Sequence, residues 1–227
     1  MGYLDHIVKV FPYLVKGAGY TIGMTTVSIF FGGIIGLFIC LAKMSKNRFA
    51  RSIGSAYVDL LRGTPLLVQI LFIYFGIPNL LRELLGGSYA MHPLLAGGIA
   101  FSLNSGAYMA EIFRGGIQSI DYGQMEAARS LGLNYIQSMR HVILPQAFRR
   151  VIPPLGNEFI ILLKDTSLLS TIAVTEIVKE GQLYIARTYA AFPTYLAIAV
   201  VYLIMTITIS KIFRSLEERM SISDRCS

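Results

Sequence analysis

Charged residues are scarce in this chain of 227 amino acids. Asp, Glu, Lys and Arg make up 15% of the sequence, whereas soluble domains carry about 25%. Hydrophobic residues make up 54%, and the mean hydropathy is +0.59. This composition excludes an ordinary soluble domain and indicates a membrane protein whose length suits one compact unit.

The basic balance of the chain does not indicate a nucleic-acid-binding protein. The formal net charge is +7. The Lys and Arg residues nevertheless cluster at the ends of apolar runs, where they say more about membrane orientation than about a nucleic-acid partner.

Motifs of hydrolases and nucleotide-binding proteins are also missing. No H-E-x-x-H motif is present, and His6, His92 and His141 are far apart in sequence, so neither a metal site nor a catalytic constellation is predicted. No G-x-x-x-x-G-K-[ST] motif is present, so the chain has no P-loop of its own. Cys40 and Cys226 do not predict a disulfide. We expect a non-catalytic protein that binds no cofactor, and energy for any driven process must come from a partner or a gradient.

Long apolar runs are what the sequence has in abundance. A membrane-spanning helix needs about 20 mostly apolar residues. Five runs predict an all-α membrane protein with five transmembrane helices in a single domain, residues 1–227. The runs cover approximately residues 17–42, 55–79, 92–113, 151–174 and 190–210, and a polar segment at about 115–150 separates the third from the fourth.

Two of these runs have special features. The first is longer than the apolar region of a signal peptide, about 7–15 residues, and lacks a small-residue cleavage site, so a retained span is predicted. The fourth is interrupted by Glu158, Lys164 and Asp165. Neither an internal repeat nor a low-complexity linker is evident.

The basic residues predict the orientation of the spans. Most of the Lys and Arg residues fall in three segments, at 43–51, 114–150 and 211–225. Cytoplasmic connections carry an excess of Lys and Arg. With five spans all three segments lie on one side, so we predict a cytoplasmic C-terminus and an N-terminus outside.

A polar hairpin is predicted at residues 121–150. Asp121 followed by Gln124 predicts the start of a short helix over 122–131, which Gly132 is well placed to end. Asn134 followed by Gln137 predicts a second helix that ends near Pro145. Such a hairpin is unusual between membrane-length runs.

The first helix of the polar hairpin has two interpretations. It carries a narrow apolar stripe of Met125, Ala128 and Leu131, rimmed by Glu126 and Arg129. The helix could lie on lipid headgroups, or it could dock in a groove of a soluble partner. The small side chains on this helix favour docking.

The hairpin also carries a recognisable pattern. The letters EAA at 126–128, Gly132 after three further residues and VILP at 142–145 resemble the EAA loop of ABC-importer permeases, E-A-A-x3-G-x9-I-x-L-P. Val142 replaces the usual Ile. Segments 62–78, 104–120 and 153–170 resemble polar amino-acid permeases of the histidine/glutamine/arginine type.

The resemblance implies a fold and a set of partners. It implies a five-span type I ABC-importer permease that pairs with a second copy or a paralogue in a bacterial inner membrane. A cytoplasmic ABC ATPase dimer would carry ATP and Mg, and an extracytoplasmic binding protein would deliver the amino acid. Glutamine is the first candidate, followed by arginine, lysine, histidine or cystine. The residues implied to couple to the ATPase are Glu126, Ala127, Ala128, Arg129, Leu131, Gly132 and Pro145.

Charged residues near the cytoplasmic side of the spans predict a gate or a structural brace, with direct substrate contact as the alternative. Asp59, Arg62 and Glu158 fall roughly 5–10 Å inside the cytoplasmic boundary, at about 1.5 Å per residue. We expect Arg62 to pair with Glu158 across helices or with Asp59 three residues away. Glu111 and Arg114 are expected at the membrane interface.

Polar residues near the midplane are candidates for substrate binding. Lys164 could bind a carboxylate, and the others could bind an ammonium group or a side chain, beside a helix that is expected to be irregular. The alternatives are that Lys164 and Asp165 neutralise each other or another chain, and that Gln69 and Asn104 join helices by hydrogen bonds. The candidate residues are Gln69, Asn104, Lys164, Asp165, Thr166 and Ser167.

A gradient-driven carrier or channel is the alternative function. In that case the intramembrane charges would form an ion relay. A carrier does not need a docking hairpin with this spacing, and an odd number of spans without an internal repeat argues against inverted-repeat carriers.

Overall fold

A computed structural model describes residues 2–222, which form helices and connecting loops with no strand among them. Arg225 and Cys226 lie outside the described residues. The elements are α1 (Tyr3–Met44), α2 (Arg48–Gly63), α3 (Leu66–Leu71), η1 (Phe72–Gly76), α4 (Ile77–Leu85), α5 (Pro93–Gln118), α6 (Tyr122–Ser130), α7 (Tyr135–Ser138), η2 (Met139–Ile143), α8 (Leu144–Asp165), η3 (Thr166–Ile172), α9 (Ile177–Thr188) and α10 (Ala191–Ile222).

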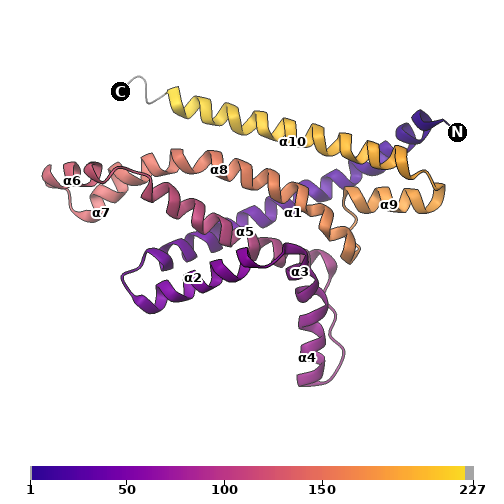
Figure 1. Cartoon of the computed structure of the whole chain (residues 1–227), viewed down its shortest axis with the longest axis horizontal. Helices are drawn as coiled ribbons and strands as arrows, with labels where there is room; N and C mark the ends of the chain where they lie inside the picture. Colours follow the sequence, from indigo (N-terminus) through magenta and orange to yellow (C-terminus); the bar gives the residue numbers. More distant parts are fainter. Residues whose placement is uncertain (1, 223–227) are drawn as a thin grey trace.

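The longer helices run side by side along the length of the molecule (Figure 1). Helices α6 and α7 form a tip at one end, and α9 and the N-terminus lie at the other. Helix α4 points across the direction of the long helices. The polar hairpin and α9 are therefore at opposite ends, as expected of segments on opposite sides of a membrane.

Small residues let α1 and α5 pack closely. Buried positions of α1 recur every three or four residues and are mostly small. A Cβ added at Gly36 would lie 2.7 Å from Cβ of Met109 on α5, so the two backbones approach too closely for a larger residue. This contact confirms that small residues serve helix packing. The buried small residues of α1 are Gly17, Thr21, Thr25, Ser28, Gly32 and Gly36.

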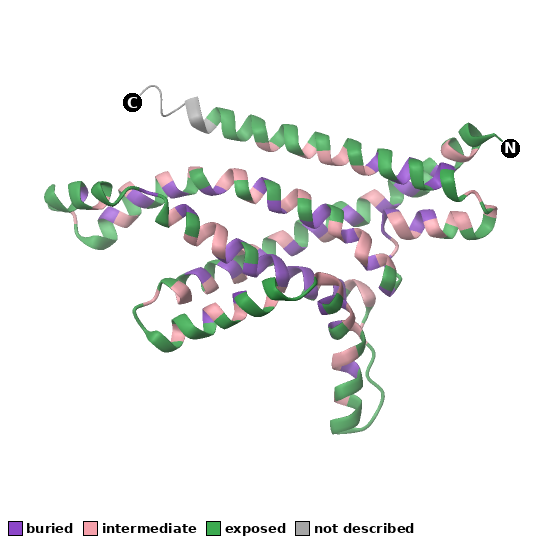
Figure 2. Ribbon diagram, in the orientation of Figure 1, coloured by how far each residue is buried: buried purple, intermediate pink, exposed green. Residues whose placement is uncertain are grey.

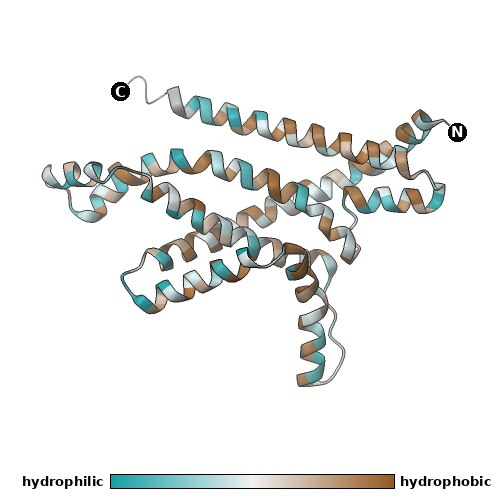
Figure 3. Ribbon diagram, in the orientation of Figure 1, coloured by the Kyte–Doolittle hydropathy of each residue, from teal (hydrophilic) through white to brown (hydrophobic). Residues whose placement is uncertain are grey.

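The buried core lies in the middle of the molecule, and the outer faces of the long helices are exposed (Figure 2). Much of that exposed surface is apolar (Figure 3), including Phe38 on α1 and Leu203 on α10, which are 66% and 57% exposed. An apolar exterior around a packed interior suits a lipid environment. Among residues 2–222, three helices are long and apolar enough to cross a membrane: Tyr3–Met44, Leu66–Leu85 and Ala191–Arg219. The count of five spans stays a prediction.

The second predicted span, 55–79, is not a single helix. Helix α2 ends at Gly63 and α3 begins at Leu66. Pro65 lacks a backbone N–H and disfavours helical torsions in the residue before it. Thr64 is accordingly extended, with φ −119° and ψ 144°. The chain therefore contains a helix break inside an apolar run.

The polar hairpin largely follows its prediction. Asp121 caps α6 by accepting a hydrogen bond from the Gly123 N–H, not through the expected partner Gln124. Gly132 follows α6 with φ +87°, a torsion that favours glycine. Asn134 and Gln137 form the expected reciprocal cap, with both bonds at 2.9 Å.

The prediction that the second hairpin helix ends near Pro145 is wrong. The helix continues through the π-helical turn η2 into α8, which reaches Asp165. Pro145 lies in the first turn of α8, directly after η2. A π-helical turn changes the local hydrogen-bond pattern, which accommodates the missing proline N–H.

Candidate functional site

The helix break is held by two amide side chains. The Gln69 amide donates to the Leu61 carbonyl at 2.8 Å and to the Thr64 hydroxyl at 2.8 Å. Asn104 of α5 donates to Gln69 Oε1 at 3.0 Å and to the Leu61 carbonyl at 3.3 Å. These bonds satisfy carbonyl groups that the end of α2 leaves without helical partners. The hydrogen bonds of the inter-helix alternative are therefore present for Gln69 and Asn104, and their role in substrate binding stays a prediction.

A pocket of about 470 Å³ lies beside this break. Its walls come from the end of α2, the break itself, α5 and α8. We call it the break pocket. Its lining residues are Arg62, Gly63, Thr64, Pro65, Leu66, Asn104, Tyr108, Glu158, Ile161, Leu162 and Asp165. The pocket brings one guanidinium group and two carboxyl groups to the same hollow.

The expected ion pair of Arg62 is not formed. Its guanidinium carbon lies 5.0 Å from the centroid of the Tyr108 ring. Within residues 2–222, no ion pair joins Arg62 to Asp59 or Glu158. Asp59 is exposed and Glu158 is buried. Arg62 lies in the last turn of α2 and lines the pocket, where the aromatic face of Tyr108 attracts the cation.

The midplane candidates separate into two groups. Asn104 and Asp165 line the break pocket, and Gln69 supports Asn104. Lys164 is exposed, Ser167 is half-buried, and neither lines the pocket. The expected irregularity is present, because α8 gives way to the 3₁₀ helix η3.

Thr166, the remaining midplane candidate, also lies outside the pocket lining. It is buried, and its hydroxyl donates to the Leu163 carbonyl at 2.7 Å. It also lies 3.4 Å from the hydroxyl of Tyr202 on α10. Its position indicates a packing role.

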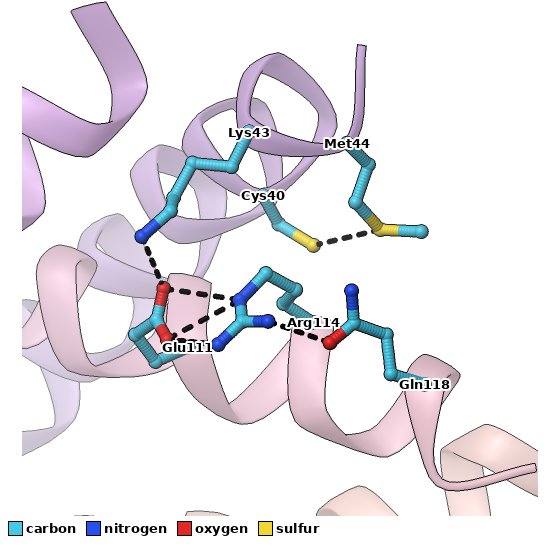
Figure 4. Close-up of polar contacts among 6 residues, drawn as sticks. All are labelled: Cys40, Lys43, Met44, Glu111, Arg114 and Gln118. Atoms are coloured by element: carbon cyan, nitrogen blue, oxygen red, sulfur yellow. Dashed lines mark hydrogen bonds and ion pairs between the residues drawn. The ribbon is translucent and has the colours of Figure 1, made fainter. Parts of the chain in front are cut away.

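Glu111 joins two helices near the hairpin end of α5 (Figure 4). It accepts from Lys43 Nζ at 2.6 Å and from Arg114 Nη2 at 2.5 Å. Arg114 also donates to Gln118. The sequence placed Glu111 and Arg114 at the interface but did not reveal that Glu111 also binds Lys43 from the end of α1. The opposite charges at the predicted cytoplasmic ends of the first and third apolar runs were the signal that could have predicted this ion pair.

We expect Glu111→Ala to lower the stability of the chain. The change removes an acceptor for two cations, and a hydrogen bond to a charged group contributes about 1.5–3 kcal/mol. The measurement is the thermal unfolding midpoint of the purified chain in detergent. Glu83→Ala on α4 is the matched control, because Glu83 is exposed and accepts a single hydrogen bond, from Asn79. Equal midpoints for the two variants would contradict a bracing role for Glu111.

Helix α6 presents one face to its own chain and the other to solvent. Ala128 is 4% exposed and Met125 packs on the cluster of Ile120, Ile143 and Ala147. The expected apolar docking stripe is therefore divided, since two of its members are used internally. The residues that remain exposed on or directly after α6 include Glu126, Ala127, Arg129 and Leu131.

A hollow of about 640 Å³ lies beside α6. Tyr122 and Arg129 of α6 line it together with Tyr135 of α7 and Met139 of η2. Leu131, at the end of α6, is 84% exposed. The hairpin thus offers an exposed helix face next to a cavity, which is the form of a docking surface.

Sequence reasoning missed Tyr108. Its ring lies under Arg62 and lines the break pocket. Tyr108 follows Asn104 by four residues, so both side chains lie on one face of α5. This helical spacing was the signal that could have identified it.

Comparisons with known proteins agree with this arrangement. The family model described as "Binding-protein-dependent transport system inner membrane component" matches residues 28–222. The chain belongs to this family. The glutamine transport system permease protein GlnP of Escherichia coli (strain K12) is 41% identical, with 93% of this chain and 94% of GlnP covered. The probable amino-acid ABC transporter permease protein YckA of Bacillus subtilis (strain 168) is 40% identical, with 93% and 90% covered.

Solved structures support the fold. A crystal structure of an amino acid ABC transporter with histidines contains a chain with 39% identity and a TM-score of 0.89, and the match covers 96% of this chain and 99% of that one. A chain of the inward-facing MetNI methionine ABC transporter has 20% identity and a TM-score of 0.71, with 92% and 97% covered. The second match shows the fold alone.

Family membership tests several expectations about fold, activity and location. The all-α fold of a type I ABC-importer permease is confirmed. The chain is a non-catalytic permease subunit, and its membrane location is confirmed by the family. The orientation of the termini and the roles of individual residues stay predictions.

Proposed function

We propose that this chain is the membrane permease subunit of an ATP-driven importer of polar amino acids. The observation that carries most weight is the break pocket, where Arg62, Glu158 and Asp165 line one hollow beside an interrupted helix. A free amino acid carries a carboxylate and an ammonium group. A guanidinium can bind the first and carboxylates can bind the second. Sites next to interrupted helices are common in transporters.

The energy for transport comes from a cytoplasmic ATPase dimer that holds ATP and Mg. The ATPase docks on the exposed side of α6, which Gly132 ends. The exposed residues there are Glu126, Ala127, Arg129 and Leu131. Ala128 supports this surface from inside. Pro145 lies at the start of α8, so movement of the hairpin passes directly into the helix that carries Glu158 and Asp165.

The other partners are a second permease copy or a paralogue and an extracytoplasmic binding protein. The polar hairpin and the C-terminus face the cytoplasm, and the N-terminus faces outside, as the Lys and Arg distribution indicates. The relatives that are named for glutamine or amino-acid transport support this assembly.

The charge of the break pocket bears on the substrate. Two carboxyl groups and one guanidinium line it, so a substrate with one net positive charge balances the pocket when both carboxyl groups are ionised. This favours arginine or lysine, and histidine with a protonated imidazole, as competitors of glutamine, the first candidate from sequence. Cystine is the remaining candidate.

The test is uptake into proteoliposomes that contain this chain, the ATPase and the binding protein. We expect labelled glutamine or a basic amino acid to enter only with ATP, and unlabelled competitors to rank the substrates. Uptake that needs an ion gradient and no ATPase would overturn the proposal in favour of a gradient-driven carrier. Omission of the ATPase from otherwise identical vesicles is the matched control.

A further inference from the structure

A second pocket follows the break pocket along the same groove. It has a volume of about 460 Å³ and lies toward the polar hairpin, so we call it the hairpin-side pocket. Its lining residues are Arg62, Tyr108, Glu111, Ile112, Gly115, Gly116, Ser119, Arg150 and Pro154. The two pockets share Arg62 and Tyr108 and no other lining residue.

The two pockets lie in series on continuous faces of α5 and of the chain around α8. On α5 the break pocket uses residues 104–108, and the hairpin-side pocket uses 108–119. On α8 the order is reversed, since 150–154 line the hairpin-side pocket and 158–165 line the break pocket. Each stretch covers 15 residue steps, about 22 Å at 1.5 Å per residue. The groove therefore runs from the helix break toward the hairpin.

Arg62 and Tyr108 stand where the two pockets meet. The guanidinium of Arg62 comes from α2 and lies over the Tyr108 ring from α5, at 5.0 Å. Both side chains are exposed to the groove. A cation over an aromatic face is a weak and reversible contact. Because α2 ends one residue later, at Gly63, small movements at the helix break would carry Arg62 toward or away from the ring.

We propose that Arg62 and Tyr108 form a gate that separates the break pocket from the hairpin-side pocket, and that the hairpin-side pocket is the exit vestibule for the amino acid. The inference deepens the proposed transport function. Arg62 is also the guanidinium proposed to bind the substrate carboxylate, whereas Tyr108 has no assigned contact with the substrate. Their contact closes the groove, and its loss opens a path for water and solutes from the break pocket toward the cytoplasm.

The experiment measures water access with introduced cysteines, so it needs neither substrate nor ATP. Ile161→Cys reports on the break pocket and Gly115→Cys on the hairpin-side pocket, where an added Cβ at Gly115 has no heavy atom within 4 Å. Cys226 is replaced with Ser, and Cys40 is kept because it is 1% exposed. A charged methanethiosulfonate reagent is added to inside-out vesicles, which expose the cytoplasmic side. The parent chain without an introduced cysteine gives the background.

We expect Gly115→Cys to react quickly. Although Ile161 is 39% exposed, we expect Ile161→Cys to react slowly, because the gate and not burial of the side chain limits access of the reagent. Tyr108→Ala should raise the Ile161→Cys rate about tenfold, the size of change that loss of one cation–π contact produces, and should leave the Gly115→Cys rate unchanged. Tyr108→Phe keeps the ring and should keep the slow rate. Arg62→Gln, which removes the cation from the other helix, should also raise the rate.

Two results would overturn the gate. One is an Ile161→Cys rate equal to that of Gly115→Cys with Tyr108 intact. The other is an Ile161→Cys rate that neither Tyr108→Ala nor Arg62→Gln changes. Because this assay is independent of uptake, failure of the gate is distinguishable from failure of the proposed importer function, which the proteoliposome assay decides.

Discussion

Glu126→Lys is expected to abolish ATP-driven uptake while the chain stays folded and inserted. The Glu126 side chain is exposed on α6. The backbone carbonyl of Glu126, not its side chain, accepts a hydrogen bond from the Ser130 hydroxyl. Reversal of the Glu126 charge therefore changes the surface that α6 presents to a partner, and it changes few contacts inside this chain. A central interface residue contributes about 2 kcal/mol or more, so ATPase affinity should fall by about 30-fold or more.

The measurement is ATPase co-purification together with uptake in proteoliposomes. Glu217→Lys on α10 is the matched control, because Glu217 is also exposed and predicted to be cytoplasmic but lies outside the hairpin. The control should retain both ATPase and uptake. If Glu126→Lys retains the ATPase and transports at the parental rate, α6 is not the coupling helix and the docking site lies elsewhere.

Local signals predicted the hairpin well because caps depend on a few neighbouring residues. Asn134 and Gln137 satisfy each other's backbone groups, and Gly132 has the torsion that ends a helix. The EAA pattern could be found for the same reason. Which side of α6 faces outward could not be predicted, since the inward side is set by the packing of Met125 on Ile143 and Ala147 from the second half of the hairpin.

The helix break at residues 64–65 was not predicted from the sequence, for a different reason. The apolar run 55–79 is long enough to span a membrane, but run length alone does not show whether the helix is continuous. Pro65 was the signal for the interruption. The partner of Arg62 was also beyond sequence reasoning. A guanidinium can bind a carboxylate or an aromatic ring, so the possible partners were Asp59, Glu158 and Tyr108. Which of them Arg62 contacts depends on the position of α2 over α5. Pocket residues from three helices meet only after those helices pack.

Neutralising the two carboxyl groups of the break pocket should reduce uptake strongly. Glu158→Gln and Asp165→Asn keep the side-chain shapes, so the helix packing should persist. Loss of one partner in a buried charge pair costs about 2–5 kcal/mol, which corresponds to a fall in substrate affinity of about 30-fold or more. The measurement is the substrate concentration that gives half-maximal ATP-dependent uptake, since a site residue changes this concentration.

Two neighbouring residues provide controls for this prediction. Lys164 precedes Asp165 directly but is exposed and does not line the pocket, and Asp59 is exposed three residues before Arg62. Lys164→Ala and Asp59→Asn should therefore leave the half-maximal concentration unchanged. A stronger effect from Lys164→Ala than from Asp165→Asn would move the site to the other side of α8. Unchanged substrate dependence in Glu158→Gln and Asp165→Asn would remove the break pocket from the transport path, because a zwitterion cannot cross it without an acceptor for its ammonium group.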